Sequence, residues 1–435
     1  MRRLFSSLAQ HRLVGGALVL AVTQFGASVM GLLRDRVLTK TFPGLDVVDV
    51  YIASFRPSDL LFQVAIMAGF SVALVPLLAK YKANGEQREM SALLSGVTGA
   101  AALVFGVIAL LMGIFFPWIA PSLTNFEGEA LELYIQFGRI ALLTNFLFVF
   151  GNAFGQYLIT IQKYWVYGIT PILYTLGTIL GTLYLTPYVG SFGPMYGTLA
   201  GAIIYVLVRL AGLLWSGYRP AFKVWHPDIR ELGWLMIPRM LALGALQVEL
   251  LLFDFLASGL PSGNLTINAY ARNFQSVVIG VAGIALAQSA FSPLSQAAAK
   301  KEAGRFWIYL KKGVGILLIL TVPGAFFLVL ATPIAARLVH LEEVLDVFRV
   351  ALTLYALSIP FESINHLLLR AYYSLKDTMI PAFFNVLNGV VAITLSWMLL
   401  DRFGIYSLAL GFTAGQIAQM IGLWVLLPRK VRALR

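Results

Sequence analysis

The residues of this chain whose chemistry most needs an explanation are six arginines within or against apolar stretches: Arg34, Arg56, Arg139, Arg209, Arg239 and Arg272. The chain as a whole is 59% hydrophobic and only 12% charged. A guanidinium stays protonated in a protein, and placing it at bilayer depth costs about 3 kcal/mol even on lenient insertion scales. Such side chains usually face an interior cavity, and several together indicate an anionic ligand. For Arg139, Arg209 and Arg239, which lie near the edges of apolar stretches, a structural role is favoured.

Two short polar groups in the first hundred residues favour recognition of phosphate. Arg34 and Asp35 close the first apolar stretch, and Asp49 and Arg56 come shortly before the second. An adjacent aspartate can orient the planar guanidinium fork toward a phosphate, whose oxygens the fork chelates. Arg272 lies near the start of the corresponding stretch in the second half, so both halves could supply a cation to one central site. The alternative is that Arg34 and Arg56 only extend to the membrane surface.

Three acidic side chains lie inside apolar stretches: Glu249, Asp254 and Glu362. An intramembrane carboxylate is a candidate for coupling to H+ or Na+, or it is the internal partner of an arginine, and pairing is favoured here. Glu362 and His366 are four residues apart and share a helical face, which is also a metal-ligand spacing. Because a third ligand is missing, a neutral, hydrogen-bonded histidine is favoured over zinc, and no metal is expected.

The elements that must position these residues are membrane-spanning helices. A mean hydropathy of +0.82 over 435 residues excludes an ordinary soluble domain. About twelve segments reach the roughly 20 apolar residues that cross a bilayer, and the short alternating segments of a β-barrel do not occur. The expected spans lie near 13–33, 59–79, 92–119, 134–160, 166–186, 194–216, 232–258, 270–296, 312–334, 347–371, 378–400 and 404–427.

The distribution of lysine and arginine predicts the orientation of these spans. Basic residues gather on one side of them: Arg2, Arg3, Arg12, Lys80, Lys82, Arg88, Arg219, Lys223, Arg230, Lys300, Lys301, Arg305, Lys311, Lys312, Arg429, Lys430, Arg432 and Arg435. One loop of the opposite side carries Glu127, Glu129 and Glu132. The positive-inside rule then places both termini in the cytoplasm. Arg34, at the outer end of the first span, breaks the rule, which suggests that it serves something other than topology.

Charge and motif content exclude several classes of function. The net charge of +12 reflects the cytoplasmic loops and favours anionic membrane lipids, whereas no basic stretch with interleaved exposed aromatics indicates nucleic acid. The chain has no cysteine and no nucleotide-binding or hydrolase motif, so it is not expected to be an enzyme or to need a cofactor. Any pumping must then draw on an H+ or Na+ gradient or on the membrane potential. Nothing in the sequence indicates a protein partner.

An internal repeat organises the chain into two halves. The segment 171–178 begins a pair of helices in the first half, and 381–388 begins a similar pair in the second. Each follows a short polar turn with a lysine and precedes a glycine-rich helix. We therefore expect an N-terminal six-helix lobe at 1–216, a basic linker at 217–231 and a C-terminal six-helix lobe at 232–435. An even number of spans per half gives both lobes the same topology, as in transporters with parallel repeats.

Two groups of motifs, one in each half of the chain, resemble the sequence signatures of a known family. The first half contains Gly31-Leu32-Leu33-Arg34-Asp35, Asp49-Val50-Tyr51, Phe55-Arg56, Gly69-Phe70-Ser71 and Val75-Pro76, and the second half contains Arg370-Ala371-Tyr372-Tyr373-Ser374-Leu375-Lys376-Asp377-Thr378. These motifs resemble the signatures of the MurJ (MviN) lipid II flippases. The chain departs from them at Ala27-Ser28, where that family usually has Ser-Arg. It also departs at Phe62, Gln63 and Met67, where the family usually carries an arginine pair and a glutamate.

The resemblance implies a fold, a site and an activity. It implies the fold of the MOP superfamily, which includes the MATE exporters: two six-helix lobes around a central cavity. It implies that a lipid-linked pyrophosphate is bound by Arg34, Asp35, Asp49, Arg56 and Arg272, and that Asp254 occupies the place of a sodium-binding acid.

The expected function is that of a flippase. It would translocate a polyprenyl-pyrophosphate cell-wall precursor, lipid II, across the bacterial plasma membrane by alternating access. The alternatives are a polysaccharide-lipid flippase or MATE-like exporter on the same fold, and a membrane scaffold that transports nothing. A cationic drug would be repelled by the arginines, which counts against a drug exporter.

Overall fold

The structure is a computed structural model that describes residues 2–67, 70, 74–218 and 229–432. The described residues form helices joined by short turns, with no β-strand among them. Within these ranges, nine helical stretches are long and apolar enough to cross a membrane. One of them, Tyr164–Leu214, contains two helices that pack against each other. The protein is therefore a multi-pass helical membrane protein, and the total of about twelve spans stays a prediction.

The chain divides into two compact units, Met1–Gln247 and Val248–Arg435. The boundary falls inside one long helix, α9 (Ile229–Ser258). Most of the expected linker at 217–231 lies outside the described residues, so the expected lobe boundaries stay a prediction. Arg2, Arg3, Arg12, Arg219, Lys223, Arg230, Arg239 and Arg435, which entered the predictions of topology and site, also lie outside the described side chains.

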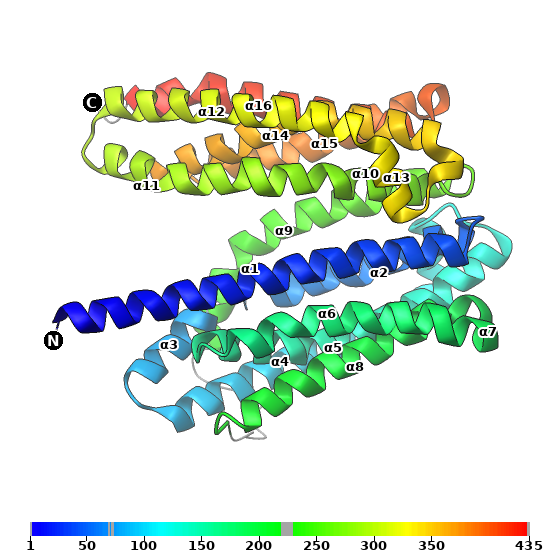
Figure 1. Ribbon diagram of the computed structural model, residues 1–435, viewed down its shortest axis with the longest axis horizontal. Coiled ribbons are helices and arrows are strands. Elements are labelled where there is room, and N and C mark those ends of the chain that lie inside the picture. Colours follow the sequence, from blue (N-terminus) through cyan, green and yellow to red (C-terminus); the bar gives the residue numbers. More distant parts are fainter. Residues whose placement is uncertain (1, 68–69, 71–73, 219–228, 433–435) are drawn as a thin grey trace. The chain divides into compact units, whose positions relative to one another are not determined.

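The first unit is a bundle of long helices (Figure 1). Its helices before α9 are α1 (Arg2–Thr41), α2 (Asp46–Phe62), α3 (Val75–Ala83), α4 (Gln87–Ile119), α5 (Gly128–Thr160), α6 (Tyr164–Leu180), the short α7 (Thr186–Val189) and α8 (Gly193–Leu214). A π-helical segment, Gln63–Met67, continues α2, and another, Gly181–Leu185, continues α6. Buried apolar side chains of α2 to α5 form the core of the unit, with Phe105, Leu93 and Leu158 at its centre.

The second unit repeats this plan (Figure 1). After α9 it contains α10 (Asn264–Val278), α11 (Ala285–Ala299), α12 (Ala303–Leu330), the short α13 (Thr332–Val339), α14 (Leu345–Ser374), α15 (Met379–Phe403) and α16 (Tyr406–Arg432). A π-helical segment, Ile279–Ile284, joins α10 to α11. The core of this unit lies where α11, α12, α14, α15 and α16 meet, around Phe306, Leu367 and Tyr372.

Left-handed turns recur at the same places in the two units, which supports the internal repeat seen in the sequence. Each of five successive loops contains a residue with positive φ, in the pairs Leu45 and Gly263, Gly85 and Lys301, Gly128 and His340, Gln162 and Lys376, and Gly190 and Gly404. Positive φ is uncommon outside glycine, because the β-carbon then crowds the backbone. Five such matches in order pair α2 with α10, α4 with α12, α5 with α14, α6 with α15, and α8 with α16.

Small residues let the last two helices of each unit pack backbone to backbone. A β-carbon at Gly197 on α8 would overlap the carbonyl oxygen of Gly177 on α6, and one at Gly411 on α16 would overlap Ser396 on α15. Helices in lipid gain little from the hydrophobic effect, so close van der Waals contact of this kind holds them together. The glycine-rich partners expected from the sequence are thus the contact faces of two helical hairpins.

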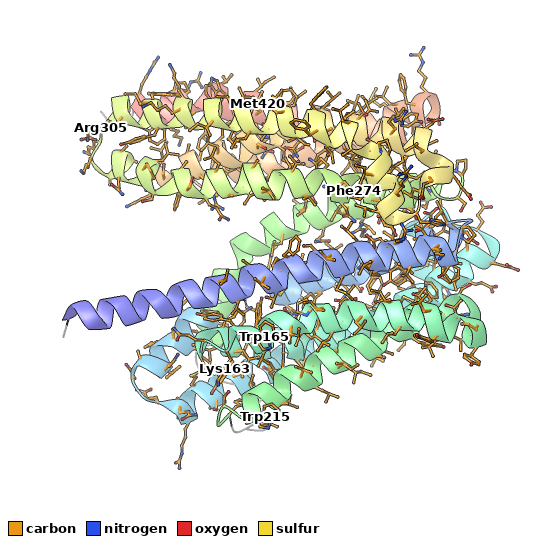
Figure 2. All side chains as sticks on the ribbon, viewed as in Figure 1. Lys163, Trp165, Trp215, Phe274, Arg305 and Met420 are labelled. Carbon is orange, nitrogen blue, oxygen red and sulfur yellow. The ribbon has the colours of Figure 1, made fainter. Side chains whose placement is uncertain are left out.

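Basic and aromatic residues mark one end of the first unit, and a basic residue marks an end of the second. In the first unit, the Lys82 Nζ at the end of α3 donates to the carbonyl oxygen of Thr160 at the end of α5, at 2.6 Å. The exposed Trp165 and Trp215 lie toward the same end as Lys163 (Figure 2). In the second unit, Arg305 lies where α11 meets α12 (Figure 2). Trp and Lys side chains at the same end of a bundle of membrane helices are typical of the interface between membrane and water.

The helix that leads into the second expected span begins several turns before the expected start of that span. The hydropathy pattern placed it at 59, whereas α2 begins at Asp46. The acidic and basic side chains of 46–58 lower the hydropathy, but most of α2 is buried inside the unit rather than exposed to lipid. Arg56 therefore lies nearly three turns inside a helix instead of before its start, and Arg272 likewise lies two turns inside α10.

Candidate polar sites in the two units

Arg34 and Asp35 form a pair on α1. The Arg34 Nε and Nη2 atoms both donate to Asp35 Oδ1, at 2.9 and 2.6 Å. The Asp35 side chain is 7% exposed and that of Arg34 is 29% exposed. A buried carboxylate beside a half-buried guanidinium fixes the direction of the arginine and is itself stabilised by the positive charge. The pair has the orienting geometry expected from the sequence.

The remaining expected residues of the first unit lie on α2. Asp49 is buried and Arg56 is half-buried. Beside them, Asn145 on α5 donates through Nδ2 to Ser58 Oγ at 2.8 Å and to Asp59 Oδ1 at 2.9 Å. The sequence drew attention to Arg56 but not to Asn145, because one amide in an apolar helix carries no signal of its own.

A tyrosine and a chain of hydroxyl groups link α1, α2, α6 and α8 in the first unit. Tyr174 on α6 is within electrostatic reach of both Arg34 and Asp59. The Tyr51 hydroxyl lies 3.0 Å from Thr198 Oγ1, which lies 2.8 Å from Thr178 Oγ1. The structure thus places Arg34 of α1 within electrostatic reach of Tyr174, and Asp59 within reach of both Tyr174 and Arg56. The hydroxyl chain was missed, since Thr and Tyr are common in membrane helices.

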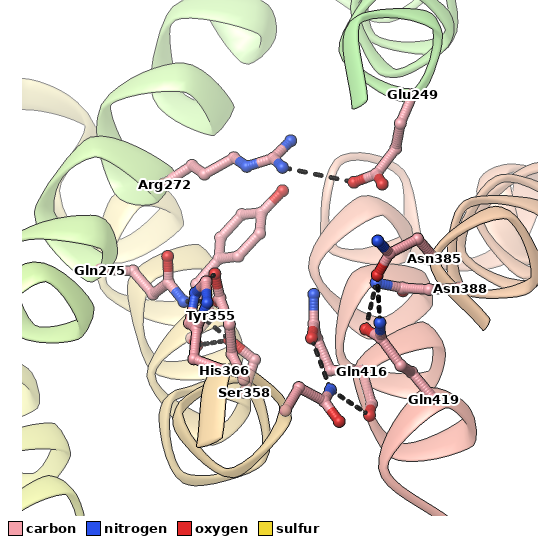
Figure 3. A network of polar contacts seen from close by, with 12 residues as sticks. Glu249, Arg272, Gln275, Tyr355, Ser358, His366, Asn385, Asn388, Gln416 and Gln419 are labelled. Atoms are coloured by element: carbon pink, nitrogen blue, oxygen red, sulfur yellow. Dashed lines mark hydrogen bonds and ion pairs between the residues drawn. The ribbon is translucent and has the colours of Figure 1, made fainter. Parts of the chain in front are cut away.

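In the second unit, Arg272 on α10 pairs with Glu249 on α9. The Arg272 Nη2 atom lies 3.3 Å from Glu249 Oε1 (Figure 3). Its guanidinium carbon lies 4.7 Å from the ring centre of Phe412, a cation–π distance. The Nη1 atom is buried and has no hydrogen-bond partner among the described residues. The expected internal pairing of an acid is therefore observed for Glu249, and Arg272 retains hydrogen-bonding capacity.

The other two expected acids of this unit differ in their surroundings. Asp254 is buried on α9. Glu362 on α14 accepts a hydrogen bond from Gln275 Nε2 on α10 at 2.7 Å, and its Oε1 lies 4.0 Å from His366 Nε2. Gln275 Nε2 also donates to Ser358 Oγ at 3.0 Å. Across the part of the chain that the structure describes, no group of three or more His, Asp or Glu side chains could hold a metal ion.

A set of amides next to this region was not foreseen. Asn365 on α14 donates to Gln416 Oε1 on α16 at 2.9 Å. Asn388 on α15 donates to Gln419 Oε1 on α16 at 3.1 Å (Figure 3). Gln419 in turn donates to Asn385. These amides join the last three long helices of the unit through polar contacts, which lipid-facing side chains cannot provide.

Arg139 and Arg209, for which a structural role was favoured, bind carbonyl groups of their own unit. Arg209 is 1% exposed and donates to Gly151 O at 2.7 Å, to Thr170 Oγ1 at 2.8 Å and to Tyr167 O at 3.3 Å. Its guanidinium also lies 4.0 Å from the ring centre of Tyr205. Arg139, which is exposed, donates from Nε to the carbonyl oxygen of Gly113 at 2.9 Å.

Comparisons with known proteins agree on one family and one fold. The family model described as "Lipid II flippase MurJ" matches residues 40–434. A "probable lipid II flippase MurJ" of Vibrio cholerae is 26% identical over 96% of this chain and 83% of its own length. A solved structure of a lipid II flippase MurJ in an inward closed conformation superposes with a TM-score of 0.79 at 19% identity, covering 96% of this chain and 90% of that one. An inward-facing MATE transporter of the MOP superfamily superposes with a TM-score of 0.76 at 15% identity, covering 94% and 95%.

Proposed function

Because the chain belongs to the lipid II flippase MurJ family, we propose that it translocates lipid II across the membrane in which its helices lie. It is a transporter rather than an enzyme. The observation that supports this function most directly is the pair of polar regions, each with an arginine that an acidic side chain orients: Arg34 with Asp35, and Arg272 with Glu249. Planar guanidinium groups are suited to the oxygens of a pyrophosphate.

We propose that Arg34, Asp35, Asp49, Arg56 and Arg272 bind the pyrophosphate of the lipid. Only the headgroup then has to leave water, because the polyprenyl chain can remain in the bilayer during alternating access. A MATE-like export of cations is disfavoured, since a cationic ligand would meet the arginines of either unit. The structural likeness to a MATE transporter concerns the fold alone.

Buried acids in the second unit support coupling to a cation. Glu249, Asp254 and Glu362 are carboxylates within apolar helices, and Arg272 acts on Glu249 and Glu362. An acidic side chain inside a membrane helix is a candidate site for a coupling ion. We therefore propose that H+ or Na+, or else the membrane potential, drives the cycle and that these acids take part.

The proposed orientation places both termini in the cytoplasm. Single cysteines introduced after Lys82 and Arg429 should react with a membrane-impermeant thiol reagent only from the cytoplasmic side. Cysteines near Glu129 and Ser262 should react from outside. The chain has no native cysteine, so the labelling is specific. A reversed result after Lys82 would overturn the orientation.

The function is tested by reconstitution. Purified protein in phospholipid vesicles should transfer fluorescent lipid II between leaflets, measured as the fraction that a membrane-impermeant quencher reaches over time. Vesicles with Arg272→Ala at equal protein content should transfer it far more slowly. Absence of transfer by the wild type, in vesicles where a known lipid II flippase is active, would contradict the proposal.

A further inference from the structure

Two pairs of side chains occupy equivalent places in the two units, although their chemical types are exchanged. Asn145 lies seventeen residues after the first residue of α5, and Glu362 lies seventeen residues after the first residue of α14. Asp59 precedes the π-helical segment Gln63–Met67 by four residues, and Gln275 precedes the segment Ile279–Ile284 by four. The left-handed turns pair the same helices, α2 with α10 and α5 with α14.

Each pair joins the same two helices by an amide and a carboxylate. In the first unit the carboxylate is on α2 and the amide on α5, with 2.9 Å between Asn145 Nδ2 and Asp59 Oδ1. In the second unit the amide is on α10 and the carboxylate on α14, with 2.7 Å between Gln275 Nε2 and Glu362 Oε2. In both units the same amide nitrogen also donates to a serine hydroxyl. We call Asp59 with Asn145 the first clasp, and Gln275 with Glu362 the second clasp.

Each clasp lies one turn from an arginine on the same helix. Arg56 precedes Asp59 by three residues, and Arg272 precedes Gln275 by three. Residues three apart lie on one face of a helix, so a contact at one of them limits how far the helix can turn at the other. The π-helical segment four residues further on interrupts the regular ladder of backbone hydrogen bonds, and such interruptions are frequent at functional sites.

We propose that the two clasps are positioning elements of the pyrophosphate site: Asn145 and Glu362 hold α2 and α10 in the rotation that directs Arg56 and Arg272 toward the ligand. The inference rests on the proposed function, because it specifies what these arginines bind. In both clasps a neutral amide donates a hydrogen bond to the carboxylate. In the second clasp, Arg272 donates to Glu249 instead, so it need not use its own N–H groups to satisfy Glu362.

The charged surroundings of the second clasp agree with this division of roles. Glu362 is within electrostatic reach of Arg272 and Glu249, and His366 is within reach of Arg370. Arg272 donates a hydrogen bond to Glu249 rather than to Glu362, and its Nη1 has no partner among the described residues. If Gln275 did not hold Glu362, that carboxylate would compete with the ligand for the Arg272 guanidinium.

The exchange of amide and carboxylate provides the test. Gln275→Glu sets two carboxylates against each other, and Glu362→Gln leaves two amides that can still form a hydrogen bond. The double variant restores an amide and a carboxylate in the arrangement of the first clasp. Binding of a polyprenyl-pyrophosphate lipid to detergent-purified protein should weaken about tenfold in Gln275→Glu and about threefold in Glu362→Gln, and should return to within about twofold in the double variant.

A thermodynamic cycle separates positioning from general stability. In an Arg272→Ala background, Gln275→Glu should weaken binding no further, because the clasp acts through that arginine. Asn365→Leu is a matched control: it breaks a similarly buried amide contact on α14, three residues beyond Glu362, without touching α10. Its affinity should stay within about twofold of the wild type, whatever its effect on thermal unfolding.

Three results would overturn the inference. These are unchanged affinity in both Gln275→Glu and Glu362→Gln, an equal loss in Asn365→Leu, or a full additional loss when Gln275→Glu is combined with Arg272→Ala. Should Gln275→Glu fail to fold, Glu362→Gln carries the same comparison, because it retains a hydrogen bond. Failure of the wild type itself to bind or transfer lipid II would instead contradict the proposed function.

Discussion

The two units each hold an arginine among aromatic rings, and the two arginines differ in what remains for a ligand. Arg209 in the first unit donates to two carbonyl oxygens and one hydroxyl and is 1% exposed. Arg272 in the second unit donates a hydrogen bond to Glu249, and its buried Nη1 has no partner among the described residues. A buried arginine therefore indicates a binding site only when its hydrogen-bonding capacity is incompletely used.

The largest effect should come from removing Arg209, each of whose three guanidinium nitrogens has a hydrogen-bond partner. Arg209→Ala removes three charge-assisted hydrogen bonds inside the first unit, to Gly151 O, Tyr167 O and Thr170 Oγ1. Hydrogen bonds to charged groups contribute about 1.5–3 kcal/mol each, so we expect a loss of at least about 3 kcal/mol of stability. Thermal unfolding in detergent measures it. Arg139→Ala, which removes one exposed contact, is the control and should cost about 1 kcal/mol or less. Comparable unfolding temperatures for Arg209→Ala and the wild type would contradict the structural role.

Backbone positions that correspond between the units should respond in opposite directions. Gly85 and Lys301 have φ of 76° and 57° in equivalent turns. A side chain is strained at such a φ, so Lys301→Gly should stabilise the second unit by about 1 kcal/mol and Gly85→Lys should destabilise the first by a similar amount. Both are measured as shifts of the unfolding temperature. Shifts of the same sign would show that the two turns are not equivalent.

The smallest expected effect is a pH dependence of stability that should occur at Asp377 in the second unit and not at the equivalent position, Lys163, in the first. Burial acts to raise the pKa of Asp377, but the Lys430 side chain, 2.7 Å away, and the N–H groups of Ile380 and Met379 outweigh it, so the pKa lies below its ordinary value. Because the pKa of Asp377 is lower in the folded protein than in the unfolded chain, its carboxylate stabilises the fold at pH values above about 3.9, the pKa of an unfolded aspartate. This stabilisation is lost as the pH falls through the pKa of Asp377 in the folded protein. Lys163 occupies the corresponding place in the first unit, so this acid dependence belongs to the second unit.

Asp377→Asn should therefore lower stability at pH 7 by about 0.5 kcal/mol, since the ion pair is partly exposed. It should also reduce the loss of stability on going from pH 7 to below about pH 4. Unfolding temperatures of wild type and variant at both pH values provide the measurement, with Lys163→Asn as the control that leaves the difference unchanged. An identical pH dependence in the wild type and Asp377→Asn would refute the assignment.

The sequence predicted features that depend on neighbouring residues and on repetition. Arg34 and Asp35 are adjacent, so their pairing on one helix could be expected, and repeated turn motifs pointed to two halves with one topology. The start of α2 could not be placed, because its polar face is buried among other helices and hydropathy does not distinguish that environment from water.

Contacts between helices distant in sequence were also beyond prediction. Asn145 and Asp59 are 86 residues apart, and Gln275 and Glu362 are 87 apart. The sequence shows that an asparagine or glutamine lies in an apolar helix, but it does not show which neighbouring helix the amide contacts. The two clasps became recognisable only when the left-handed turns and the π-helical segments showed which residues of the two units correspond.

Equilibrium binding measures whether Arg34 and Arg272 bind a pyrophosphate. Purified wild type, Arg34→Ala, Arg272→Ala and Arg139→Ala would be titrated with a polyprenyl-pyrophosphate lipid and with the corresponding monophosphate. Charge-assisted hydrogen bonds contribute about 1.5–3 kcal/mol each, so the first two variants should bind the pyrophosphate about ten- to a hundredfold more weakly, and Arg139→Ala should match the wild type. The wild type should also prefer the pyrophosphate. Equal affinity of all four proteins for the pyrophosphate would mean that neither Arg34 nor Arg272 binds it.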